Sequence, residues 1–166
     1  ALLVISVGIS TKAQQNGAYA KGANLLNIGL GINSAYNGGI PFGISYEKGI
    51  TEDISLGGNF DYLSHEYLSD FKFTSIYIGA RGSYHFNNLL KIKSDQLDLY
   101  GGATLGYRNF SWKDTNQNLG DSSYGSGIFL GAYIGGKYYF SNKIAGFAEF
   151  GEIGSTNAKI GLAFKF

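Results

Sequence analysis

The amino-acid sequence predicts an all-β protein whose fold is an eight-stranded antiparallel up-and-down transmembrane β-barrel. First, eight segments alternate apolar residues with small or polar ones, which is the period at which strand side chains point to opposite faces. Second, the apolar sets contain no charged residue, and a Lys or Arg facing lipid at mid-bilayer costs about 2–4 kcal/mol. Third, each apolar set ends in an aromatic residue. Because lipid cannot satisfy a free sheet edge, the predicted sheet closes on itself.

Four strands are predicted in the first half of the chain, near residues 26–36, 40–47, 54–62 and 76–86. A Gly-rich loop at residues 37–39 separates the first two, and Pro41 lies near a strand start, where a missing ladder donor is tolerated. A tight turn follows at residues 49–51. The polar stretch from Ser64 to Lys72 predicts a longer loop before the fourth strand.

The second half repeats this scheme, with strands predicted near residues 97–108, 128–140, 144–150 and 157–166. Residues 87–96 are predicted as a turn region, and the polar stretch from Lys113 to Ser123 as the longest loop. Ser141-Asn142 indicates a short hairpin turn. A short loop that contains glycine then returns the chain to the last strand.

Composition limits the other classes of protein. The chain has 166 residues, which is enough for one domain. Its net charge of +1 and the lack of a basic run indicate no nucleic-acid partner. It has no cysteine, so disulfides and thiolate metal sites are excluded. With 26 Gly and 1 Pro, it resembles neither collagen nor a disordered chain.

The N-terminal residues resemble the end of a secretory signal peptide. An apolar run from Leu2 to Ile9 precedes Thr11-Lys12-Ala13, which has the small-x-small pattern of a cleavage site. We therefore expect residues 1–13 to be a signal-peptide remnant, residues 14–22 an N-terminal extension and residues 23–166 the β-barrel. A retained strand is the alternative, because the apolar run also alternates. A membrane-spanning helix is disfavoured, since the run is shorter than the roughly 20 residues required.

The aromatic ends of the apolar sets predict girdles at the two membrane interfaces. Consecutive strands run in opposite directions, so aromatics at every downstream end divide between the two sides of the membrane. The predicted girdle consists of Tyr36, Tyr46, Tyr62, Tyr84, Phe86, Tyr107, Tyr138, Phe140, Phe150, Phe164 and Phe166. In such barrels the periplasmic turns are the short ones, and the loop lengths here predict that both termini are periplasmic.

The opposite face of the predicted strands carries a nearly balanced set of charges. Its members are Glu47, Asp61, Arg81, His85, Asp98, Arg108, Lys137, Glu149, Lys159 and Lys165. Counting across hairpins places Glu149 opposite Lys159 and His85 opposite Asp98. A bore of eight strands is just wide enough for side chains to fill, so we expect a paired, structural charge network. A narrow ion or proton path along these charges is the alternative.

Three stretches of the chain resemble the small outer-membrane β-barrels of bacteria, the group that includes the transmembrane domain of OmpA and OmpX. These stretches are residues 46–57, 99–107 and 159–166. The resemblance implies a bacterial outer-membrane location, contact with outer-membrane lipid and lipopolysaccharide, and assembly by machinery that reads the C-terminal aromatics Phe164 and Phe166. Since the sequence ends at Phe166, we expect no peptidoglycan-binding domain of the kind that OmpA carries, and anchoring to the cell wall is not implied.

Some eight-stranded barrels modify lipids with a His, a Ser and a carboxylate near the outer leaflet. Of the two His, His85 is predicted to point inward at the periplasmic end. In Ser64-His65-Glu66, neighbours on an extended chain point to opposite sides and cannot form a triad alone, although Ser69 and Asp70 are near in sequence. No catalytic residue, cofactor or metal is therefore predicted, and a lipid-modifying enzyme is the weaker alternative.

The predicted function is that of a structural or adhesive barrel, or of an accessory subunit of an envelope complex. Aromatic residues in and beside the predicted outer loops indicate either the rim of the girdle or a binding surface: Tyr67, Phe71, Phe73, Phe110, Trp112 and Tyr124. Glycines on the lipid face indicate either close approach of another outer-membrane protein or lipid, or bending of the barrel: Gly58, Gly82, Gly101, Gly136 and Gly146.

Overall fold

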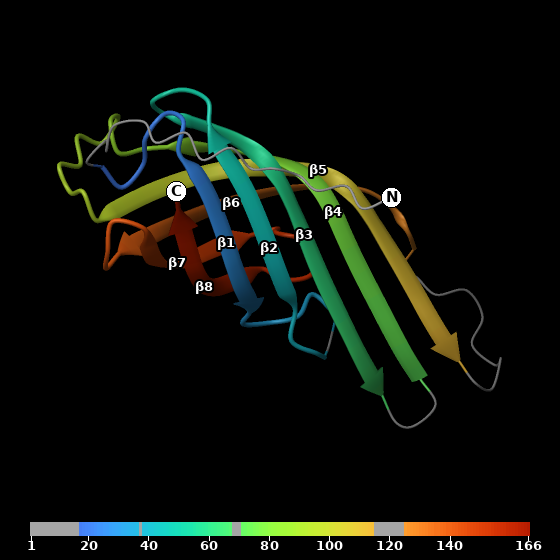
Figure 1. Cartoon of the computed structure of the whole chain (residues 1–166). Helices are drawn as coiled ribbons and strands as arrows, with labels where there is room; N and C mark the ends of the chain where they lie inside the picture. Colours follow the sequence, from blue (N-terminus) through green and yellow to red (C-terminus); the bar gives the residue numbers. More distant parts are fainter. Residues whose placement is uncertain (1–16, 37, 68–70, 115–124) are drawn as a thin grey trace, which may run out of the picture.

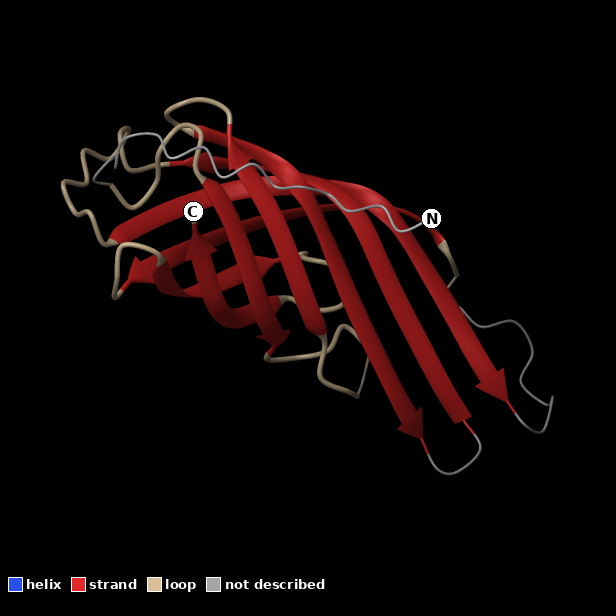
Figure 2. Ribbon diagram, in the orientation of Figure 1, coloured by secondary structure: helices blue, strands red, loops and turns tan. Residues whose placement is uncertain are grey.

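A computed structural model describes residues 17–36, 38–67, 71–114 and 125–166. These residues form one closed barrel of eight strands, coloured along the chain in Figure 1 and by secondary structure in Figure 2. The strands are β1 (Asn24–Gly31), β2 (Phe42–Gly49), β3 (Ile54–Tyr67), β4 (Phe71–His85), β5 (Leu97–Asp114), β6 (Gly127–Tyr139), β7 (Ile144–Gly151) and β8 (Ala158–Lys165). Within the described ranges, no helix is long and apolar enough to cross a membrane.

Every strand pairs antiparallel with its neighbours in the sequence, and the first strand pairs with the last. Leu26 of β1 lies opposite Tyr46 of β2 on one side and Phe164 of β8 on the other. At the seam, the amide of Asn24 donates to the carbonyl of Phe166 at 2.8 Å, and the amide of Phe166 donates back at 3.0 Å. The predicted eight-stranded antiparallel up-and-down barrel is therefore confirmed.

The barrel wall has its apolar side chains outside and its charged side chains inside, which is the opposite of the arrangement in a water-soluble protein. Large apolar residues face outward, as Leu130 and Ile134 show with exposures of 70% and 65%. Charged residues face inward, as Glu47 and Arg81 show with exposures of 2% and 5%. A strand places successive side chains on opposite faces, so closing the sheet turns the polar face into the bore and the apolar face into the outer wall.

Three strands run further than the sequence predicted, and in Figure 1 β3, β4 and β5 extend past their neighbours at one end. The stretch from Ser64 to Lys72, predicted as a loop, belongs largely to the β3–β4 hairpin, because Ser64 pairs with Thr74 and Glu66 with Lys72. Similarly, β5 continues to Asp114. The prediction followed outward apolar residues, whereas backbone pairing continues after the outward side chains become polar.

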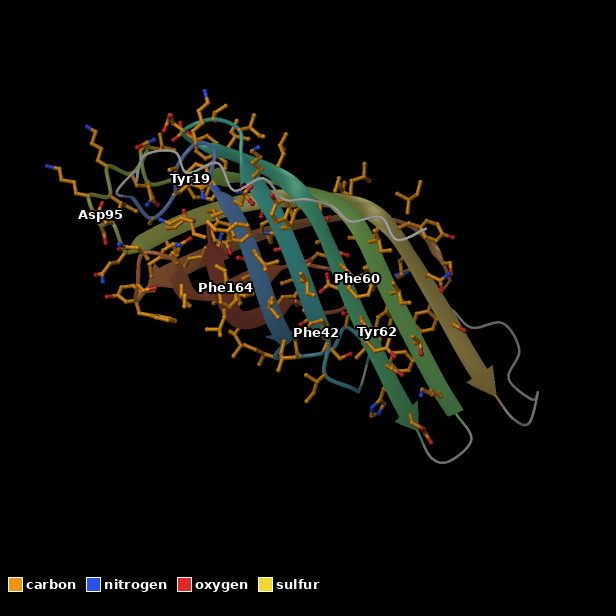
Figure 3. All side chains as sticks on the ribbon, in the orientation of Figure 1. Tyr19, Phe42, Phe60, Tyr62, Asp95 and Phe164 are labelled. Atoms are coloured by element: carbon orange, nitrogen blue, oxygen red, sulfur yellow. The ribbon has the colours of Figure 1, made fainter. Side chains whose placement is uncertain are left out.

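Most of the predicted aromatic girdle lies on the outer wall (Tyr62 and Phe164 are labelled in Figure 3). Phe86 and Phe164 are half-buried, and the exposed members are Tyr46, Tyr62, Tyr84, Tyr107, Tyr138, Phe140, Phe150 and Phe166. The prediction for Tyr36 is wrong, since this residue is only 7% exposed. Because β1 ends at Gly31, the following loop carries Tyr36 into the bore, where its hydroxyl lies 2.6 Å from that of Tyr77.

Ile134 offers a test of the outward face, because it lies in the middle of the apolar row on β6. We predict that Ile134→Lys lowers the free energy of unfolding in phospholipid vesicles by about 2–4 kcal/mol, since the charge would face hydrocarbon. The same change at Ile128, near the end of the row, should lower it by about 0–1 kcal/mol. Denaturant titration of the reconstituted protein measures both values. Equal effects at the two positions would contradict a lipid-facing wall.

Candidate functional site

The candidate site is the interior of the barrel, and its near end, where β1 begins and β8 ends, is closed by residues 17–22. The ring of Tyr19 stacks on that of His85 with centroids 3.5 Å apart. The Tyr19 hydroxyl lies 3.0 Å from the carbonyl of Thr51 and 2.7 Å from that of Ile54, to which it donates. Burial, followed by the charges of nearby carboxylates, raises the pKa of Tyr19 well above its usual value. Tyr19 is thus a fixed part of the closure (Figure 3).

Lys165 fastens the same N-terminal segment to the end of β8. Its Nζ donates to the carbonyl of Gly17 at 2.5 Å and lies 4.7 Å from the centroid of the Tyr139 ring. Ala18 is buried in a cluster with Tyr139 and Phe147. The sequence predicted residues 14–22 only as an extension. The aromatic residue Tyr19, a few positions before the first strand, was the available signal for a closure.

The middle of the bore holds an ion network centred on Arg81 of β4. Its Nε lies 2.8 Å from Oε1 of Glu47 on β2, and its Nη2 lies 2.8 Å from Oε1 of Glu149 on β7. Ser55 and Ser83 each donate a hydrogen bond of 2.7 Å to the second oxygen of Glu47. Buried charges are tolerated only when they are paired and hydrogen-bonded, and this network meets that condition across three strands that are not neighbours.

Tyr100 links this network to a second cation. Its hydroxyl donates to Glu149 Oε1 at 2.9 Å, and its ring lies under the ammonium group of Lys137, 4.5 Å from the centroid. Lys137 Nζ is also 3.9 Å from Oδ2 of Asp98. An ammonium held between an aromatic face and a carboxylate is stabilised by both.

A row of Ser55, His85 and Asp98 has the spacing of a nucleophile, a base and an acid. Ser55 Oγ lies 3.0 Å from His85 Nε2, and His85 Nδ1 lies 2.7 Å from Asp98 Oδ1. However, the hydroxyl of Ser55 donates to Oε2 of Glu47 at 2.7 Å. A nucleophilic serine instead donates its hydrogen to the histidine. The Ser55 hydroxyl thus belongs to the ion network, which favours a structural role for the row.

A separate ion pair joins Asp61 of β3 to Lys159 of β8 further along the bore. Asn59 donates to Oδ2 of Asp61 at 3.3 Å, and Thr104 donates to Oδ1 of Asn59 at 2.8 Å. Gly43 of β2 gives the pair its space, because a Cβ at this position would collide with both charged groups.

Counting across hairpins correctly placed Glu149 opposite Lys159, whereas the residue opposite His85 is Tyr100 and not Asp98. His85 and Asp98 form the predicted contact, although they are not directly opposite residues. Glu149 and Lys159 are Cα partners as predicted, yet each forms its ion pair with a residue from another strand. Long side chains reach diagonally across a narrow bore, and counting along adjacent strands does not include those contacts.

The far end of the bore, where β3–β5 extend, is closed by aromatic and aliphatic side chains. A buried cluster with two partly buried rings against it consists of Tyr36, Leu63, Phe73, Tyr77, Phe110 and Phe129. The prediction of an exposed rim is wrong for Phe73 and Phe110, which hold inward positions on the lengthened β4 and β5. The side chains of Tyr67, Phe71, Trp112 and Tyr124 lie outside the described part of the chain.

Two loops complete this far closure. Tyr36 comes from the β1–β2 loop, and its hydroxyl lies 3.5 Å from Nη1 of Arg108, whose Nε donates to the carbonyl of Gly125 at 3.0 Å. From the β7–β8 loop, Ile153 and Thr156 are buried, and the Thr156 hydroxyl donates to the carbonyl of Asn33 at 2.5 Å. Because both loops are largely polar in composition, their sequences did not predict that they turn into the bore.

The second histidine, His65, belongs to β3 and not to a loop. Its ring lies 6.2 Å from that of Phe73 on the inner face, whereas the adjacent Ser64 and Glu66 alternate to the outer face. Ser69 and Asp70 lie outside the described residues. Among the residues that the structure does describe, no three His, Cys, Asp or Glu side chains are grouped as metal ligands.

A closed antiparallel sheet with an apolar outer wall and a charged, filled bore defines the architecture of the small outer-membrane β-barrels. Solved structures of this class share the fold. The N-terminal barrel of Pseudomonas aeruginosa OprF has a TM-score of 0.57 and 20% identity, covering 89% of this chain and 100% of that one. OprG of the same organism has a TM-score of 0.59 and 11% identity, covering 91% and 98%.

Ail, the attachment invasion locus protein of Yersinia pestis, has a TM-score of 0.55 and 15% identity, covering 88% of this chain and 99% of Ail. At these identities the likeness concerns the fold alone. A scan against protein-family models gave no match, and a search of curated proteins gave none either.

Arg81 provides the sharpest test of the ion network. We predict that Arg81→Met lowers the free energy of unfolding by about 3–5 kcal/mol, because two buried carboxylates lose their shared cation. The matched control is Lys143→Met at an exposed turn position, for which a change within about 0.5 kcal/mol is expected. Denaturant titration measures both variants. Wild-type stability in Arg81→Met would show that the network does not hold the barrel.

Proposed function

We propose that this chain is an integral β-barrel of the bacterial outer membrane with a closed bore. In this proposal it acts at the membrane surface as a structural, adhesive or accessory protein. The ends of β3, β4 and β5 that continue past β2 and β6, residues 63–67, 71–75 and 109–114, are called the extension here. The observation that carries the proposal is that the polar and apolar faces of these strands exchange sides along the extension.

This reversal occurs one residue after Tyr62 on β3. Up to that point the outward residues are apolar and Asp61 points inward, but beyond it Ser64 faces outward and the buried Leu63 faces inward. On β4, the pair of Thr74 outward and Phe73 inward repeats the arrangement. A strand that passes from hydrocarbon into water is expected to change in this way, because its outward neighbours change from lipid to water.

A filled bore favours a structural role over the alternative of a narrow channel. Tyr19 closes the near end, the Arg81 network occupies the middle, and the cluster around Tyr36 closes the far end. Each of these closures is made by side chains that are hydrogen-bonded or packed, so opening a path would require several of them to move together.

The extension itself is the feature that best fits an adhesive or accessory role. The β2–β3 pairing stops at Tyr62, and the β5–β6 pairing stops at Arg108, whereas β3, β4 and β5 remain paired with one another beyond those residues. A strand edge that lacks a neighbouring strand is a ready surface for another chain. Ail, which shares the fold, was crystallised with the heparin analogue sucrose octasulfate, and we extend a surface-binding role to this chain.

An enzyme is not favoured by the Ser55, His85 and Asp98 row, because the hydroxyl of Ser55 donates to Glu47 of the ion network. We further propose that both termini are periplasmic and that Phe164 and Phe166 are read by the barrel-assembly machinery. The proposed surroundings are outer-membrane lipid and lipopolysaccharide, and another outer-membrane protein is the proposed partner.

Conductance measurements separate the closed barrel from a channel. We predict that the full chain, reconstituted into a planar lipid bilayer, gives no stepwise current, because charged and aromatic side chains fill the bore from end to end. Steady current steps that change in size in a Glu149→Gln variant would overturn the closed-bore proposal, since they would show ions passing along the network.

Shortening the extension tests the surface role. Leu63 and Ser75 are Cα partners, so replacing residues 64–74 with Asn-Gly joins them by a two-residue turn. We predict that this variant still folds but no longer retains the outer-membrane components that the full chain captures from solubilised native membranes. A variant changed at the Ser141-Asn142 turn, at the opposite end, should capture them normally. Identical capture by all three proteins would contradict the role of the extension.

A further inference from the structure

The outward face of the extension contains a polar hollow of about 180 Å³ lined by Tyr62, Lys72, Thr74 and Ser111. Three of these side chains carry a hydroxyl and the fourth carries an ammonium group, and no carboxylate is among the described side chains that line the hollow. The residues come from three adjacent strands, β3, β4 and β5. This donor set is suited to an anion with several acceptor oxygens.

The hollow lies at the level where the outer wall changes from apolar to polar. Tyr62 pairs with Ile76 in the last row that includes apolar outward residues. The next outward row runs from Ser64 through Thr74 to Ser111, all directly opposite one another. In the proposed membrane location, this row stands where acyl chains give way to headgroups.

The row above the hydroxyls supplies the positive charge of the hollow. Glu66 is directly opposite Lys72, but of these two side chains it is Lys72 that lines the hollow. A ligand in the hollow therefore meets an ammonium group beside hydroxyl donors, which favours a negatively charged ligand.

We propose that this hollow binds the phosphate group of a lipid headgroup in the leaflet that surrounds it. The ammonium group of Lys72 pairs with the phosphate, and the hydroxyls of Thr74 and Ser111 donate to its oxygens. The ring of Tyr62 borders the headgroup on the side of the acyl chains. This inference rests on the proposed membrane location and adds a binding site to it.

The test uses the full folded chain in detergent micelles, titrated with phosphatidic acid and followed by native mass spectrometry. We expect one tightly held phosphatidic acid per barrel and weaker binding of phosphatidylcholine, whose phosphate is shielded by a cation. Lys72→Gln should weaken phosphatidic acid binding about tenfold, the usual effect of losing one charge-assisted contact. Thr74→Val should weaken it by a smaller factor. The matched control is Lys93→Gln, an exposed lysine at the other end of the barrel, which should bind as the wild type does.

Three outcomes would overturn the site. Equal weakening by Lys72→Gln and Lys93→Gln would mean a diffuse charge effect, and no weakening in Lys72→Gln would mean that the hollow is not used. Complete displacement of the lipid by millimolar inorganic phosphate would mean that the hollow takes a soluble anion. Failure of the chain to insert into phosphatidylcholine vesicles would count against the membrane location instead, so the two proposals fail separately.

Discussion

The buried guanidinium of Arg81 is the interaction on which the rest of the barrel depends. Its two carboxylate partners come from β2 and β7, neither of which is adjacent to β4. Only a closed sheet brings these three strands to face one another, so the network can form only once β1 and β8 have paired. Closure of the backbone and neutralisation of the buried charge are therefore a single event. The number and stagger of the strands set the width of the bore, and these three side chains are long enough to span it.

The two ends of the bore are closed by different means, and this difference decides where function can lie. At the near end a short N-terminal segment is held by a stacked ring and backbone hydrogen bonds. At the far end a loop contributes Tyr36 to an aromatic cluster. With both ends and the middle occupied by groups that satisfy one another, the interior has the properties of a protein core. Surfaces that meet other molecules are then those on the outer wall and on the extension.

The sequence predicted the fold because period-two alternation is a local property of each strand. The same alternation indicated an inward direction for Glu47, Arg81 and Lys137, which the structure buries. The sequence did not predict the partners of Lys159 and Glu149, because these depend on distances across the bore. It placed Tyr36 on the wrong face because alternation was continued past Gly31, where the strand ends. It took Ser64 to Lys72 for a loop because outward polarity was read as the end of pairing, when Phe73 on the inner face still signalled a strand.

The extension and the ion network contribute independently to the stability of the barrel, although they share strands. Beyond Tyr62 and Arg108, the long strands lose their β2 and β6 neighbours. In their place, Tyr36 packs against Leu63 and Phe73 on the inner face of the extension. None of these residues touches Arg81 or its carboxylates in the interactions described, and sites without shared partners contribute nearly additively to stability. The outer face of the extension can therefore take part in binding while the charge network holds the barrel closed.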